Sequence, residues 1–258
     1  MIGYRSAVKQ VQDNSASYTA TVGGTPSLSS CAYLLANNTT FNESVVIGNN
    51  VGVCNALFWN CTNFNKPITL PSNVYDCMYM FYGASKFNSK VTIENNTIGS
   101  LGGLFYGSNC QIPLDANVKS NDMGYLYSFS NFNNVFMMNY GTYYWQAFMR
   151  SKMNSNCYLP NSVIEMGWLF YETPFFSNLF IRGGYRDINI NRVFDVNVNG
   201  FNTHRKNVYF NSELTNVFSR NDNNSLIGKN ITWAFVIGGN TFYNSAYNIY
   251  CYNNLPLQ

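Results

Sequence analysis

The sequence has few of the groups that catalysis requires. Charged residues make up 10% of the 258 residues, and histidine occurs once, as His204. No GxSxG, HExxH or P-loop motif occurs, so no familiar nucleophile, metal or phosphate site is present. No CxxC pair accompanies the lone histidine, which disfavours a metal site. We therefore expect a protein that is not an enzyme and that uses no cofactor.

Strong charge and long apolar runs are also missing. The formal net charge is +3 with the Lys and Arg residues scattered, which does not make a phosphate-binding surface. No run of eighteen or more apolar residues occurs, and the first residues lack a secretory apolar region. We expect no nucleic-acid partner, no membrane insertion and no export signal in this chain.

The seven cysteines are odd in number, which disfavours a complete disulfide framework. Cys31, Cys54 and Cys77 are spaced 23 residues apart and are expected to stack as an apolar ladder of free thiols. The alternative is a disulfide, because equivalent positions in neighbouring units lie about 4.8 Å apart when strands pair.

A repeated unit is clearest from Asn73 to Asn96. Its apolar residues Val74, Cys77, Met80 and Phe81 predict a helical segment, Gly83 a turn and residues 91–93 a short strand. About two dozen residues cannot bury both faces alone, so such a unit needs neighbours of its own kind.

An apolar marker, the second residue of an LF-like pair, recurs every 21 to 24 residues, as in leucine-rich-type repeats. The markers are Leu35, Phe58, Phe81, Phe105, Leu126, Phe148, Phe170, Phe194, Phe218 and Phe242. This spacing predicts an α/β repeat solenoid of about ten coils over residues 25–258, with one short-stranded parallel sheet. The predicted core includes Cys54, Phe58, Cys77, Phe81, Phe170 and Phe218.

Residues 1–24 lie outside the repeat and are expected to cap the solenoid or to dock it onto a partner. The spacing of Tyr4, Val8 and Val11 suits a short amphipathic helix in this segment.

The segment CMYMFYGASKFNSKVTI, residues 77–93, resembles the repeat of the BspA-like leucine-rich-repeat proteins, whose units read approximately N-V-x-x-M-x-x-M-F-x-x-x-x-x-F-N. The match is close around Phe58 and Phe81, recognisable around Leu35 and degenerate after Phe105. The resemblance implies a right-handed leucine-rich-repeat-like solenoid and a role in adhesion or surface recognition. Such repeats are also similar to modules of bacteriophage tail and head-fibre proteins.

The middle residue of each strand triplet should point outward, because its apolar neighbours point inward. These residues change from small to aromatic along the chain. The expected ligand or partner face comprises Phe136, Tyr158, Phe180, Tyr209 and Tyr250. An exposed aromatic row can bind sugar rings or a protein. Alternatively, the rings pack under loops or a sister subunit. A second polar feature is the cationic loop at His204, Arg205 and Lys206.

Two functional classes follow, a binding module and a purely structural part of an assembly. The expected partners are a protein or surface glycan, with sister subunits of a virion as a further possibility. The missing export signal favours a virion protein, such as a phage tail, fibre or capsid-decorating component. The alternative is an adhesin on the bacterial cell surface that binds host protein or glycan.

Overall fold

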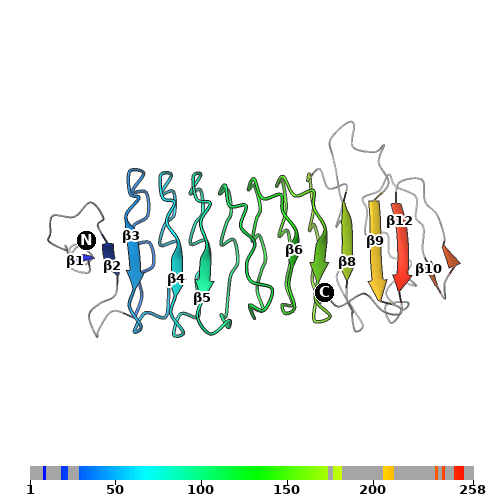
Figure 1. Ribbon diagram of the computed structural model, residues 1–258, viewed down its shortest axis with the longest axis horizontal. Helices are drawn as coiled ribbons and strands as arrows, with labels where there is room; N and C mark the ends of the chain where they lie inside the picture. The colour runs from blue at the N-terminus through cyan, green and yellow to red at the C-terminus, as the bar shows by residue number, and fades with distance from the viewer. Residues whose placement is uncertain are drawn as a thin grey trace.

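The structure is a computed structural model that describes residues 29–173 and 177–181, together with the backbone of the strands outside these ranges. Successive units follow one another in a row along the long axis (Figure 1). The strands are β1 (Val8–Lys9), β2 (Thr19–Val22), β3 (Ser44–Ile47), β4 (Ile68–Leu70), β5 (Val91–Ile93), β6 (Phe136–Met137), β7 (Cys157–Leu159), β8 (Asn178–Ile181), β9 (Lys206–Asn211), β10 (Val236–Ile237), β11 (Asn240–Thr241) and β12 (Tyr247–Tyr252).

The strands pair mainly in parallel. β4 pairs with β5, and a larger sheet has the order β12-β9-β8-β7-β6 with every pair parallel. β10 and β11 form an antiparallel pair. In β4 and β5 the first and third residues are buried and the middle threonine is exposed, as period-two alternation requires.

The sheet is not continuous along the described units, unlike the single sheet that the sequence predicted. The tripeptide at residues 112–114, between β5 and β6 in the chain, is irregular and forms no strand. Its middle residue is Pro113, which has no N–H group to donate to a ladder, and this explains the break between β5 and β6.

The segment around each buried marker consists of turns, and the described residues contain no helix. This differs from the helical segment that the sequence predicted. In the unit around Phe58, the N–H groups of Cys54, Ala56, Phe58 and Asn60 donate to carbonyls 22 residues ahead. Intervening N–H groups close local turns, such as that of Leu57 onto the carbonyl of Cys54. We call this stretch of each unit, residues 54–60 here, the turn segment.

Two residues with positive φ set the shape of each turn segment. In one unit they are Tyr79, at 53°, and Gly83, at 65°. Equivalent pairs four residues apart recur seven times, from Tyr33 and Asn37 to Trp168 and Glu172. A residue with positive φ interrupts the consecutive right-handed φ and ψ values that an α-helix needs, so a regular helix cannot form. The pattern in which four N–H groups of one turn segment donate to carbonyls of the next unit occurs six times between Cys31 and Tyr171.

The core is a column of stacked rings. Phe58 and Phe81 lie 5.4 Å apart between ring centroids with an interplanar angle of 2°, and Phe81 and Phe105 lie 5.8 Å apart. The column continues through Tyr127, not the predicted marker Leu126, since Tyr127 stacks on Phe105 at 4.9 Å. Burial confirms the predicted core at Cys54, Phe58, Cys77, Phe81 and Phe170, whereas Phe218 lies outside the described residues.

Tyr127 can replace phenylalanine in the column because its hydroxyl is satisfied. It donates to the Ile112 carbonyl at 3.2 Å. A buried phenol without a partner would be costly, so this bond keeps the ring at the marker position.

The cysteines in the described residues are buried free thiols, as expected, and Cys251 lies outside the part whose side chains are described. Cys31 contacts Cys54 with a sulfur–sulfur distance of 3.3 Å. The pKa of the Cys54 thiol is raised strongly, chiefly by its hydrogen bond with Cys31 and then by burial. The Cys54 thiol therefore stays protonated and packs as a small apolar group.

A ladder of side-chain amides joins successive units at the residue that follows Phe41, Phe64 and Phe87. The Asn42 side-chain oxygen accepts from the N–H of Asn65, and the Asn65 oxygen accepts from that of Asn88, at 2.9 and 2.8 Å. The ladder continues through Gln111 and Asn133. The asparagines therefore satisfy backbone donors where no strand pairs, and they fix the register between units.

The N-terminal segment contains strands where the sequence predicted an amphipathic helix. β1 includes Val8 and pairs antiparallel with β2, which pairs in parallel with β3. β2 thus occupies the open edge of β3, which would otherwise present unpaired backbone groups.

Candidate partner-binding surfaces

Phe136, the first residue of the predicted partner face, is buried. Its exposed fraction is 0%, whereas Val135 before it is 46% exposed. Phe136 packs edge-on against Phe148 at 5.0 Å. The predicted outward position is therefore wrong for this residue: the alternation is shifted by one, so that Phe136 and Met138 point into the core.

Tyr158 and Phe180 lie on neighbouring strands, are half-buried and stack closely. Their ring centroids are 4.4 Å apart with an interplanar angle of 4°. Tyr158 pairs with Met137 on one side and with Phe180 on the other in the strand register. Each stacked ring covers a face of the other, so this pair presents mainly ring edges outward.

The strand register continues the row to the remaining predicted positions. Phe180 pairs with Tyr209, and Tyr209 pairs with Tyr250. The side chains of Tyr209 and Tyr250 lie outside the described part, as do those of the cationic loop at His204, Arg205 and Lys206. We call Tyr158, Phe180, Tyr209 and Tyr250 the strand-face row.

A second aromatic surface lies on the turn segments, at positions that the sequence analysis did not single out. Its rings contact one another continuously across the first six described units. We call it the turn-face strip: Tyr33, Trp59, Tyr79, Tyr82, Tyr106, Tyr125, Phe129 and Trp145. All of its members are exposed or half-buried, and Tyr33 is 63% exposed.

The strip combines two ring orientations. Trp59, Tyr82 and Tyr106 follow the buried markers by one residue and stack as a column, with centroid distances of 3.9 and 4.7 Å. Tyr79 stands across this column, at 67° to Trp59 and 70° to Tyr106. The column thus offers ring edges, whereas a ring turned across it can offer a face to a ligand.

Small residues make room for the turned rings. A Cβ atom at Gly103, which has positive φ, would lie 2.3 Å from Cδ1 and Cε1 of Tyr79. Tyr79 therefore fills the space of a side chain at position 103, and this glycine is required for packing as well as for its backbone conformation.

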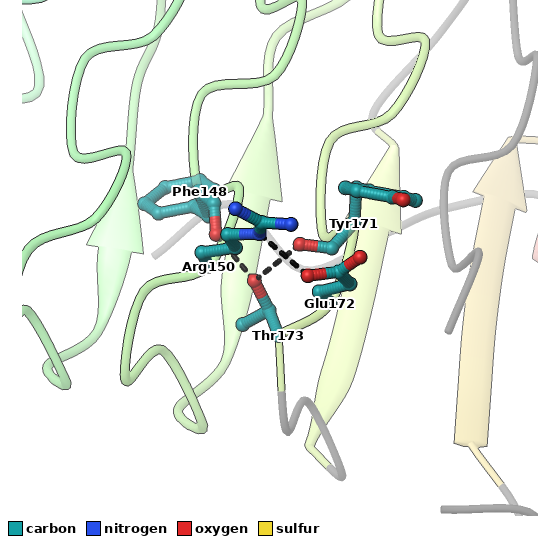
Figure 2. Close-up of polar contacts among 5 residues, drawn as sticks. All are labelled: Phe148, Arg150, Tyr171, Glu172 and Thr173. Atoms are coloured by element: carbon teal, nitrogen blue, oxygen red, sulfur yellow. Dashed lines mark hydrogen bonds and ion pairs between the residues drawn. The ribbon is translucent and has the colours of Figure 1, made fainter. Parts of the chain in front are cut away.

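The far end of the strip carries an ion pair. Arg150 Nε donates to Glu172 Oε2 at 2.5 Å, and the Arg150 guanidinium lies over the Phe129 ring at 5.4 Å. Figure 2 shows Arg150 and Glu172 reaching toward each other from neighbouring units, with the Thr173 hydroxyl donating to the carbonyls of Phe148 and Tyr171. The hydrogen bond from Arg150 lowers the pKa of Glu172, so the pair is ionised and neutral overall at pH 7.

Three tyrosines of the strip lose their protons less readily than a free tyrosine does. Partial burial raises the pKa of Tyr79, Tyr106 and Tyr125, with smaller contributions from neighbouring groups.

The described residues contain no cluster of three or more His, Cys, Asp or Glu side chains suited to a metal ion. In the same part of the chain, no helix is long and apolar enough to cross a membrane.

Neither protein-family models nor curated proteins nor solved structures match this chain. The resemblance to BspA-like repeats therefore rests only on the repeat residues of this sequence.

A signal for the turn-face strip is present in the sequence. Trp59, Tyr82 and Tyr106 each follow a marker phenylalanine, and Tyr33 and Tyr79 each precede a marker by two residues. The assumption of a helix hid this pattern, because it assigned outward positions only to the strands.

Proposed function

We propose that this chain is a non-enzymatic binding protein whose repeated units form a leucine-rich-repeat-like solenoid of the BspA-like type. In this proposal it is a structural and adhesion component of a virion, such as a phage tail, fibre or capsid-decorating protein. It recognises a host surface or a partner subunit. The alternative is a bacterial cell-surface adhesin with the same kind of contact.

The observation that supports this proposal best is the stacked, outward pair of Tyr158 and Phe180 within a register-aligned row. Ring edges such as those of Tyr158 and Phe180 suit a protein surface, because they offer apolar area together with a tyrosine hydroxyl. A partner subunit is therefore the favoured occupant of the strand-face row. The proposal of a virion component is based on the similarity of the repeats to modules of bacteriophage tail and head-fibre proteins.

The test replaces Tyr158, Phe180 and Tyr209 together by alanine in the full chain. We expect the variant to remain folded and to lose self-assembly, incorporation into particles or attachment to cells, because outward residues contribute more to an interface than to the core. Mass in solution, particle incorporation and cell binding are measured beside the parent. Thr69→Ala and Thr92→Ala, on the outer face of β4 and β5, are the controls. A triple variant that assembles and binds like the parent would exclude this use of the row.

A further inference from the structure

The turn-face strip contains inclined rings, unlike the parallel pair of Tyr158 and Phe180 in the strand-face row. Tyr33, Tyr79 and Tyr125 occupy the same position in every second unit, and Ala56 and Gly103 hold that position in the intervening units. All three tyrosines are inclined to the column beside them: Tyr33 by 42° to Trp59, Tyr79 by 67° to Trp59, and Tyr125 by 54° to Tyr106.

The spacing of these tyrosines follows from the stacking of the units. Adjacent units linked by parallel backbone pairing are about 4.8 Å apart, so every second unit gives a step of about 10 Å. Such a step is comparable to the length of a disaccharide in an extended glycan chain. Tyr33 to Tyr125 covers four unit steps, or about 19 Å, enough for a short oligosaccharide.

The charge of the strip narrows the ligand class. Its rings carry no charge, and the cation at its end, Arg150, is already paired with Glu172. Nucleic acids and acidic polymers would require unpaired cations along the surface. A sugar chain instead offers polarised C–H groups, which are attracted to the negative face of an aromatic ring.

Polar side chains occur in the same turn segments as the rings. Asn60 donates to the Asn37 side-chain oxygen at 3.1 Å on an exposed ladder, and Asn55 donates to Asp76 at 2.8 Å. Amide and carboxylate groups that hydrogen bonds hold in fixed orientations can bind sugar hydroxyls.

We propose that the turn-face strip binds an extended neutral glycan, which lies along the units with sugar rings on Tyr33, Tyr79 and Tyr125. The inference rests on the proposed binding function and deepens it by naming a ligand class and a second surface. The strand-face row is left to a protein partner.

The test uses the full chain and a panel of neutral cello-, chito-, xylo-, manno- and malto-oligosaccharides of increasing length. We expect at least one series to bind, with affinity that rises with length until the chain spans Tyr33 to Tyr125. Changing all three tyrosines to alanine should weaken this binding at least about tenfold. The triple phenylalanine variant should retain it, because the rings remain.

Tyr75→Ala combined with Tyr143→Ala is the matched control, since both tyrosines are exposed and neither belongs to the strip. Binding should also change little between low and high salt, because the contact is uncharged. Circular dichroism confirms that each variant is folded.

Three results would overturn the inference. They are no binding to any neutral series, binding that survives the triple alanine variant, and binding that is equal for monosaccharide and oligomer. If the triple alanine variant changes the mass of the chain in solution and not its glycan binding, the strip is a subunit interface instead. Loss of assembly in the Tyr158, Phe180 and Tyr209 variant with intact glycan binding would separate the two surfaces.

Discussion

Replacing Phe81 by alanine should remove the centre of the ring column. Phe81 is fully buried and stacks on Phe58 at 5.4 Å, on Phe87 at 3.9 Å and on Phe105 at 5.8 Å. Its loss therefore opens a cavity that reaches three units. Truncation of a fully buried phenylalanine to alanine lowers the free energy of unfolding by about 3–5 kcal/mol. Aromatic pairs contribute about 0.5–1.5 kcal/mol beyond their buried area, which places this site in the upper part of that range.

The assay is urea unfolding followed by circular dichroism, with the free energy of unfolding extrapolated to water. Thr92→Ala is the control, because Thr92 is the exposed middle residue of β5 and should cost less than about 0.5 kcal/mol. A Phe58→Ala and Phe81→Ala double variant should be non-additive, since the two rings are in contact. Equal losses for Phe81→Ala and Thr92→Ala would refute the assignment of inward and outward positions.

Two further predictions concern the backbone and the thiols. Gly107 has φ of 66° at the position that Asn37 and Asn60 hold in other units, so Gly107→Asn should cost less than about 0.5 kcal/mol and Gly107→Val about 1–2 kcal/mol in the same urea assay. Burial raises the pKa of Cys61 to about 11 and that of Cys110 to about 12, from 9.0. The folded chain holds these protons more tightly than the unfolded chain, so the stability that depends on the protonated thiols should be fully present below pH 9. The free energy of unfolding should then fall by about 1.4 kcal/mol per pH unit for each of these two thiols as the pH rises toward 11. A melting temperature unchanged between pH 8.5 and 10.5, or a slope that Cys110→Ala does not reduce, would contradict this.

The sequence predicted the residues of the core better than the shape of the backbone. Phe58, Phe81 and Phe170 are buried as expected, because the period and the apolar marker depend on the sequence alone. Apolar residues at spacings of three, three and one fit a helix and also a run of turns. The choice between them is made by left-handed residues such as Tyr79 and Gly83, and tyrosine gives no sign that it will adopt positive φ.

The errors at the candidate site have similar causes. Residues 135–138 read Val-Phe-Met-Met, so apolar alternation fits either phase and could not show that Phe136 points inward. Leu126 and Tyr127 are adjacent and both buried, and the hydrogen bond to Ile112 that admits Tyr127 to the column is invisible in the sequence. The positions of the turn-face strip recur in the sequence, but the ring angles between units do not follow from residue spacing.

Both aromatic surfaces depend on one claim, that equivalent residues of successive units stand next to each other. Nuclear Overhauser contacts between selectively labelled phenylalanine rings test this claim most directly in solution. We predict contacts of Phe81 with Phe58 and with Phe105, and of Phe148 with Phe170, whose centroids are 5.4 Å apart. Contacts of Phe81 with neither Phe58 nor Phe105 in the folded chain would contradict the stacking on which both surfaces are built.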